Sequence, residues 1–398
     1  MTTTSPIAER SNFVLVLALY GAGLGAAAQY GKASVLFPLL RDAYPQAGAG
    51  LGLVVSGIGM LGIVFGLTAG LVVARLGFRR LLLGALVFGA AMSALQSGLP
   101  PLPLMIAARI AEGLSHLVIV VAAPTLIAQV SAPRHRAMTL TLWSTFFGVS
   151  FAVLAWVGQP FALRHGPGAL FLAHAGYLLA MAVILAIGLP RQRHLPAGPR
   201  LTPAALMRQH LRIYRSPRIA APALGWLFYT LGYVALVTVL PDFVAPDQRS
   251  LVTGAMPLAG MVVSMTLGVV LVNRFGPVPV VLSGFFLAVP VALALGFSGV
   301  NPMLAIALIA CLGLVQGASF AAVPQLNRGA EAQAEANGAM AQMGNLGNSL
   351  GTPILLAATS AFGLAGLTGF AMLCFAAGGA VHLVLAAARR VAPDTAEG

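Results

Sequence analysis

The sequence predicts an all-α polytopic membrane protein with twelve transmembrane helices arranged as two pseudo-symmetric six-helix bundles. Of its 398 residues, 59% are hydrophobic and only 8% are charged, whereas a soluble chain carries about 25% charged residues. The apolar residues form continuous runs long enough to span the hydrocarbon core as helices. They lack the alternating pattern of transmembrane β-strands. Basic residues gather in alternate loops between the runs, as in polytopic membrane proteins.

Twelve apolar runs are bounded by charges or by clusters of Pro and Gly. They cover residues 13–40, 50–74, 78–98, 102–130, 137–161, 167–189, 219–243, 251–273, 278–298, 302–326, 337–360 and 363–388. The first run contains Ala26-Ala27-Ala28, which could mimic a signal-peptide cleavage site. Because the run continues to residue 40, and its removal would leave eleven spans, we expect it to be a transmembrane helix.

The distribution of arginine predicts that both termini are cytoplasmic. With the N-terminus inside, seventeen arginines lie in inner segments, and only Arg41, Arg164 and Arg249 lie outside. Positive residues of polytopic proteins gather on the cytoplasmic side, so the net charge of +13 needs no nucleic acid as a partner. We expect a multi-pass protein of the bacterial inner (plasma) membrane, in contact with the lipid bilayer and monomeric.

A polar stretch rich in Pro and Arg, residues 191–218, is the longest between two runs. Such a composition is typical of a linker. The sequence therefore predicts an N-terminal six-helix bundle over 1–190, a cytoplasmic linker over 191–218 and a C-terminal six-helix bundle over 219–398.

The two halves resemble each other in the order of several short motifs. Residues 112–116, followed by Pro124, are similar to residues 316–320, followed by Pro324. Parallel six-span repeats are a known transporter architecture, with the binding site near the midplane between the halves. The repeat thus favours a transporter.

The loop after the second run carries a recognisable motif. In order, it contains Gly70, Arg75, Gly77, Arg79 and Arg80. These residues resemble the signature Gly-x-x-x-Asp-Arg-x-Gly-Arg-Arg of the major facilitator superfamily, with Ala74 in place of the acidic residue and with the basic pair one position later, after Phe78. In that family the Asp helps to close the cytoplasmic side, so the resemblance leaves open how this gate closes.

The resemblance covers the whole chain. Arg109 and Gly113 match the family pattern Arg-x-x-x-Gly of the fourth span, and residues 109–124 also resemble the cyanate/nitroimidazole-type branch. Membership implies a secondary transporter that moves a small-molecule substrate by alternating access. It also implies that spans one and four line the central cavity.

Ionisable residues are costly within a membrane and are therefore candidates for function. Arg109, Glu112 and His116 lie on one face of the fourth run, and Lys32 lies at a similar depth in the first. We expect Lys32 and Arg109 to bind substrate, and Glu112 or His116 to carry protons. The alternative is an ion pair that only fixes helix packing. His174 and His382 are interpreted as packing or lipid-interface residues.

Uncharged polar residues mark further faces of a substrate cavity. The substrate-binding candidates are Gln29, Tyr30, Tyr229, Tyr233, Gln316, Asn345 and Asn348. Hydrogen bonding between helices is the alternative role for each of them. The gating candidates are Arg75, Arg79, Arg80, Glu331 and Glu335, which we expect to pair on the cytoplasmic face.

Two deep cations against one acid favour an anionic solute. The sequence therefore predicts a proton-coupled secondary transporter of a small organic anion. The alternative is a proton-coupled drug or multidrug exporter, for which an acid would be expected where Lys32 stands. The chain has no ATP-binding phosphate loop, His-Glu-x-x-His motif or intramembrane acid pair, so we expect no enzyme, no catalytic residues, no cofactor and no metal. A channel or a non-transporting sensor is a third class.

Overall fold

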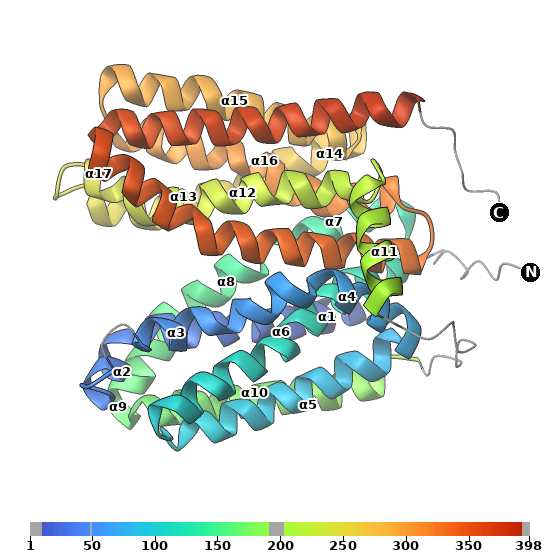
Figure 1. The fold of residues 1–398 in the computed structure, drawn as a ribbon, viewed down its shortest axis with the longest axis vertical. Helices are drawn as coiled ribbons and strands as arrows, with labels where there is room; N and C mark the ends of the chain where they lie inside the picture. Colours follow the sequence, from blue (N-terminus) through green and yellow to red (C-terminus); the bar gives the residue numbers. More distant parts are fainter. Residues whose placement is uncertain (1–9, 48–49, 191–202, 392–398) are drawn as a thin grey trace, which may run out of the picture. The chain divides into compact units, whose positions relative to one another are not determined.

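The computed structural model describes residues 10–47, 50–190 and 203–391, and the chain divides into two compact units. Unit 1 comprises Met1–His135 and Thr145–Thr202, and unit 2 comprises Arg136–Ser144 and Pro203–Gly398. Within the described ranges the regular structure is helical throughout (Figure 1). The domain boundaries expected from the sequence stay a prediction, and their linker is described only from residue 203.

Unit 1 is built from ten helices within its described residues, although α7 is grouped with unit 2 from Arg136 onward. They are α1 (Phe13–Val35), α2 (Phe37–Ala43), α3 (Gly50–Ser56), α4 (Met60–Leu76), α5 (Phe78–Ser97), α6 (Leu102–Val130), α7 (Pro133–Ser144), α8 (Phe146–Val153), α9 (Gln159–His165) and α10 (Pro167–Gly188).

Unit 2 contains seven further helices in the part of the chain that is described. They are α11 (Pro203–Arg215), α12 (Ala220–Val239), α13 (Arg249–Val263), α14 (Val269–Phe275), α15 (Pro277–Ser298), α16 (Pro302–Leu326) and α17 (Ala330–Val391). Figure 1 shows α17 as two arms that meet at a sharp bend. The bend contains Gly363, whose φ of 57° is accessible to glycine at little cost.

The described helices account for the twelve predicted spans. Ten segments are long and apolar enough to cross a membrane, and the bent pair Leu53–Gly66 and Thr68–Leu76 forms an eleventh. Because α17 is one of the ten and consists of two helices joined at Gly363, the total is twelve. The predicted all-α polytopic fold is confirmed.

The same residue types begin and end helices in the two halves of the sequence, although Asn12 and Asn301 precede the first and the tenth span and are not equivalent in the repeat. The side chain of Asn12 caps α1, and that of Asn301 caps α16, each accepting a backbone N–H at 3.0 Å. Gly77 and Gly276 end α4 and α14 with φ of 94° and 82°. These left-handed positions favour glycine, which explains why the same residue follows Arg-x in both halves.

Close packing of helix backbones also repeats, and it corrects one detail of the sequence repeat. A Cβ on Gly113 would overlap the carbonyl oxygen of Ile58, and one on Gly313 would overlap that of Gly260. Gly113 precedes Pro124 by as many residues as Gly313 precedes Pro324. The match of residues 112–116 with 316–320 is therefore one helical turn out of structural register.

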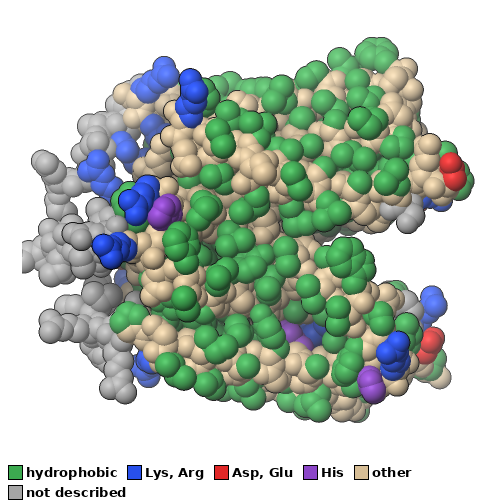
Figure 2. Space-filling view, turned by 180° about the vertical axis from the view of Figure 1, so that it is seen from behind, with side chains coloured by type: hydrophobic (Ala, Val, Ile, Leu, Met, Phe, Trp, Pro, Cys, Tyr) green, Lys and Arg blue, Asp and Glu red, His purple; other side chains and the backbone are tan. Residues whose placement is uncertain are grey.

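The outside of each unit is apolar. Figure 2 shows hydrophobic side chains across much of the visible surface, with most Lys and Arg toward its two ends. Large side chains such as Val14, Ile187, Phe297 and Leu373 are more than 70% exposed, which is the arrangement expected against lipid. Inside unit 1, by contrast, two of the largest fully buried side chains are Lys32 and Arg109.

Candidate functional site

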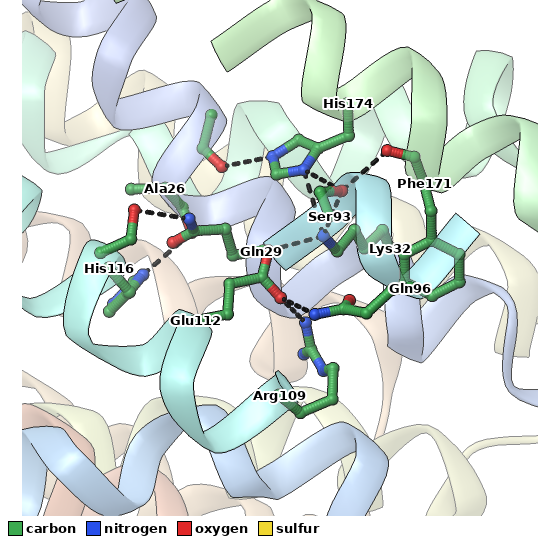
Figure 3. A network of polar contacts seen from close by, with 12 residues as sticks. Ala26, Gln29, Lys32, Ser93, Gln96, Arg109, Glu112, His116, Phe171 and His174 are labelled. Carbon is green, nitrogen blue, oxygen red and sulfur yellow. Dashed lines mark hydrogen bonds and ion pairs between the residues drawn. The ribbon is translucent and has the colours of Figure 1, made fainter. Parts of the chain in front are cut away.

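Helices α1, α5, α6 and α10 bring polar side chains together inside unit 1 (Figure 3). The cluster, called the buried network below, consists of Lys32, Ser93, Gln96, Arg109, Glu112 and His174. Lys32 is on α1, Arg109 and Glu112 are on α6, and the rest are on α5 and α10. The expectation that spans one and four bring their ionisable residues together is met within this unit.

Glu112 lies at the centre of the buried network. Its Oε1 accepts a hydrogen bond from the Lys32 ammonium at 2.6 Å, and its Oε2 accepts from Nη1 of Arg109 at 2.6 Å. The side-chain amide of Gln96 donates a third bond to Oε2 at 2.9 Å. The three charged side chains are 0% exposed. The carboxylate is thus the shared counter-ion of two buried cations.

The Lys32 ammonium uses all three of its N–H groups. Besides Glu112, it contacts Oγ of Ser93 at 2.8 Å and Nδ1 of His174 at 3.1 Å. Nε2 of His174 lies 3.0 Å from the carbonyl oxygen of Gly25, which can only accept. The proton of His174 is therefore assigned to Nε2, and the lone pair of Nδ1 faces Lys32.

Two polar atoms of the buried network have no hydrogen-bond partner among the described residues. They are Nη2 of Arg109 and Oε1 of Gln96. Of the other guanidinium nitrogens of Arg109, Nη1 donates to Glu112 and Nε donates to the carbonyl oxygen of Val54 at 2.6 Å. With two cations and one carboxylate, the ionised network carries an excess positive charge, and the N–H groups of Nη2 have no acceptor among the described residues.

His116 lies one turn along α6 and has a different environment. Its Nδ1 lies 2.9 Å from the carbonyl oxygen of Ala26, so Nδ1 carries the proton. No described residue hydrogen-bonds to Nε2. The ring packs edge-on against Tyr30 with centroids 4.9 Å apart and is 6% exposed. Its second nitrogen therefore offers a lone pair at the margin of the network.

Gln29 lies on α1 between these two regions but has a structural contact. Its amide donates to Oγ of Ser115 at 2.9 Å, and Ser115 donates to the carbonyl oxygen of Ala85. This is the hydrogen bonding between helices that was the alternative role for Gln29.

The other predicted substrate-binding residues lie in unit 2. Tyr229 stacks on Trp226 with ring centroids 4.5 Å apart, and Tyr233 stacks on Tyr229 at 5.2 Å. Gln316 donates to the carbonyl oxygen of Ser144 at 2.7 Å. On α17, Asn345 donates to a carbonyl of its own helix and the Oδ1 of Asn348 has no partner among the described residues. Their role in substrate binding stays a prediction.

Two of the gating candidates, Arg79 and Glu335, have contacts within their own units. Arg79 donates to the carbonyl oxygens of Ala186 and Leu189 at the end of α10. Arg80 and Glu331 are exposed, and Arg75 is half-buried. The buried carboxylate of Glu335 pairs with Arg212 of α11 at 2.7 Å. Their role in gating stays a prediction.

Three members of the buried network escaped sequence reasoning. Ser93 and Gln96 lie one turn apart in the mostly apolar run 78–98. Their i, i+3 spacing, which places them on one helix face, is the pattern that could have identified them. The interpretation of His174 as a lipid-interface residue is wrong, because it is buried and contacts Lys32. His382 is also buried, but neither of its nitrogens has a partner among the described residues, as for a packing residue.

These residues can bind ions and exchange protons. The excess positive charge can be balanced by an anion, and the imidazole of His116 can take up a proton. Among the described residues, no group of three His, Cys, Asp or Glu side chains could hold a metal ion.

Comparison with known proteins places the chain in a family. The sequence model of the Major Facilitator Superfamily matches residues 13–352. A comparison with curated proteins finds no sequence match. Members of the superfamily are transporters, not enzymes.

Solved structures share the fold at low sequence identity. The Escherichia coli fucose:proton symporter FucP, in its outward conformation, has a TM-score of 0.76 and 14% identity, with 94% of this chain and 99% of that chain covered. The proton:xylose symporter XylE has a TM-score of 0.73 and 14% identity, with 94% and 95% covered. The human organic anion transporter MFSD10 has a TM-score of 0.70 and 18% identity, with 93% and 98% covered. With a family match over most of its length and twelve spans in the fold of these transporters, the chain belongs to the Major Facilitator Superfamily.

Proposed function

We propose that the protein is a secondary active transporter that moves a small organic anion by alternating access, coupled to protons. The observation that carries the proposal is the charge of the buried network. Lys32 and Arg109 share one carboxylate, Glu112, and all three are 0% exposed. An excess charge inside a membrane protein is costly unless it is balanced. A substrate anion supplies that balance, and the free Nη2 of Arg109 supplies a donor for it.

His116 is the better placed of the two proton-coupling candidates. Glu112 already accepts three hydrogen bonds, two of them from cations. A proton on this carboxylate would have to displace one of them. Nε2 of His116 has no such competitor among the described residues. In this proposal His116 takes up the coupling proton, and Glu112 holds the two cations in position for the substrate.

The fold neighbours support the coupling by analogy only. FucP and XylE are described as proton symporters of sugars, and MFSD10 as an organic anion transporter. The resemblance of residues 109–124 to the cyanate/nitroimidazole-type branch points in the same direction as the charge of the buried network, toward a small anion.

Ligand binding to the purified protein tests the substrate class. Small organic anions should raise the thermal midpoint of the wild type but not of Lys32→Ala or Arg109→Ala. Arg164→Ala, at an exposed arginine of α9, is the matched control and should respond as the wild type does. Anion binding retained in both network variants contradicts the proposal. Cation binding that strengthens in Lys32→Ala favours the drug exporter instead.

Uptake into proteoliposomes tests the coupling. His116→Gln should exchange substrate across the membrane but fail to concentrate it in response to a pH gradient. If His116→Gln still concentrates substrate with a pH gradient, and Glu112→Gln exchanges substrate without concentrating it, the proton is carried by Glu112. If both variants concentrate it, coupling uses another group or another ion.

The orientation is part of the same proposal. The arginine distribution favours cytoplasmic termini and a location in the bacterial inner membrane. Two variants test this, Arg390→Cys and Arg164→Cys, in each of which the new residue is the single cysteine. Intact cells are treated with a membrane-impermeant reagent that labels cysteine. Only the cysteine at position 164 should react.

A further inference from the structure

Helix α11 presents two kinds of side chain on its outer surface. Met207 and Leu211, one turn apart, are 62% and 47% exposed. Arg208 and Arg215, two turns apart, are also exposed. The apolar and basic residues thus form two adjacent stripes along the helix.

The end of α11 is held where membrane spans end. Only four residues separate Arg215 from α12, and they form a hydrogen-bonded turn in which Ser216 bonds to Arg212 and Ala220 to Ser216. Nη1 of Arg389, near the end of α17, donates to the carbonyl oxygen of Pro217 at 2.9 Å. This short connection to an apolar span places α11 near the level of the lipid headgroups.

The inner face of α11 is fixed to α17. Arg212 pairs with Glu335 at 2.7 Å, and the hydroxyl of Tyr214 donates to Oε1 of Gln342 at 2.6 Å. Burial raises the pKa of Tyr214, so the phenol remains a donor at physiological pH. Ile213 is fully buried. These contacts leave Met207, Arg208, Leu211 and Arg215 on the outer surface.

The charge of this segment is of one sign. Residues 191–218 contain seven arginines and no aspartate or glutamate. A helix with a basic stripe beside an apolar stripe lies in the membrane interface, where it binds anionic lipids. A protein partner is less favoured, because α11 is attached to a membrane span by a turn that leaves it beside the lipid.

We propose that the outer surface of α11 is a docking site for anionic phospholipid headgroups of the membrane that holds the protein. Arg208 and Arg215 bind the headgroup phosphates, and Met207 and Leu211 insert at the boundary of the acyl chains. Arg212 is turned toward Glu335 and takes no part. This surface is separate from the buried network, and the inference does not rest on the proposed transport activity.

Lipid retention measured by native mass spectrometry tests the site. The purified full-length protein is titrated with phosphatidylglycerol or phosphatidylcholine. The wild type should retain phosphatidylglycerol preferentially. Each basic residue at a membrane surface contributes about fivefold to lipid affinity, so Arg208→Gln/Arg215→Gln should lower phosphatidylglycerol affinity about 25-fold.

A matched pair of exposed arginines of unit 1 serves as the control. Arg41→Gln/Arg164→Gln removes the same charge and should leave the affinity unchanged within about twofold. Met207→Ser/Leu211→Ser should weaken phosphatidylglycerol binding while keeping the preference over phosphatidylcholine. Inorganic phosphate at the same concentration should not compete. Equal retention by the α11 and control variants, or competition by free phosphate, would overturn the proposal.

Discussion

The ammonium nitrogen of Lys32 lies 2.6 Å from Oε1 of Glu112, and neither side chain is exposed. The pair joins α1 to α6 in the interior of unit 1. A buried pair adds little net stability over an apolar contact, but the loss of one partner leaves an uncompensated charge. A single substitution therefore separates the two roles considered for these residues. A packing role predicts a loss of stability alone, whereas a binding role also predicts a loss of substrate affinity.

Glu112→Gln is expected to destabilise the protein by about 3–5 kcal/mol, because it leaves two buried cations without a counter-ion. The measurement is unfolding of the detergent-solubilised protein. Gln96→Met, which removes one neutral donor to the same carboxylate, is the control and should cost about 1 kcal/mol. Addition of Lys32→Met to Glu112→Gln should restore part of the stability. Independent, additive effects of the two substitutions would contradict a coupled pair.

Two of the three histidines buried in the described spans, His174 and His382, should respond differently to substitution. His174→Leu removes the acceptor that faces Lys32 and should cost about 1–3 kcal/mol, as for a buried donor left unpaired. The same change should weaken anion binding, since Lys32 loses a contact that positions it. His382→Leu removes nitrogens that have no partner among the described residues and should be neutral or stabilising. Similar losses in both variants would mean that His174 acts by packing alone.

The repeat predicts equal sensitivity of two glycines in different units. Gly113→Ala and Gly313→Ala should each cost about 1–3 kcal/mol, because the new Cβ meets a backbone carbonyl that cannot move aside easily. Gly84→Ala on α5 and Gly254→Ala on α13 have open space at the Cβ and should be neutral or slightly stabilising. Thermal unfolding of the four variants checks this. If Gly113→Ala does not change thermal unfolding, α6 and the backbone at Ile58 can move apart at little cost.

The spans were predictable because their signal is local. A continuous apolar run needs no tertiary information to be identified as a transmembrane helix. The division between the last two runs, 337–360 and 363–388, was also predictable from local sequence. In the structure the chain bends at Gly363 without forming a loop. The register of the internal repeat could not, since Gly317 and Gly313 are both small residues in α16 and only the contact with Gly260 distinguishes them.

The buried network was predictable in part. Lys32, Arg109 and Glu112 are rare residue types at membrane depth, and similar depth was sufficient to pair them. Ser93 is a common residue in transmembrane helices, so its presence in α5 carried little information. For His174, depth alone does not give the direction of the side chain around the helix axis. That direction separates the lipid face from the interior, and it depends on packing.

The last prediction concerns Glu335, which pairs with Arg212 inside unit 2 at 2.7 Å. If Glu335 also pairs with the arginines after the second span when the cytoplasmic side closes, the two partners compete for one carboxylate. Arg212→Gln should then favour the closed cytoplasmic side, and Glu331→Gln/Glu335→Gln should disfavour it. Because pairs with an exposed partner contribute about 0–1 kcal/mol, each shift should be about fivefold at most and should leave the fold intact. Distances between spin labels across the cytoplasmic face measure both shifts. Shifts in the same direction, or none, would show that Glu335 serves only to hold α11 on α17.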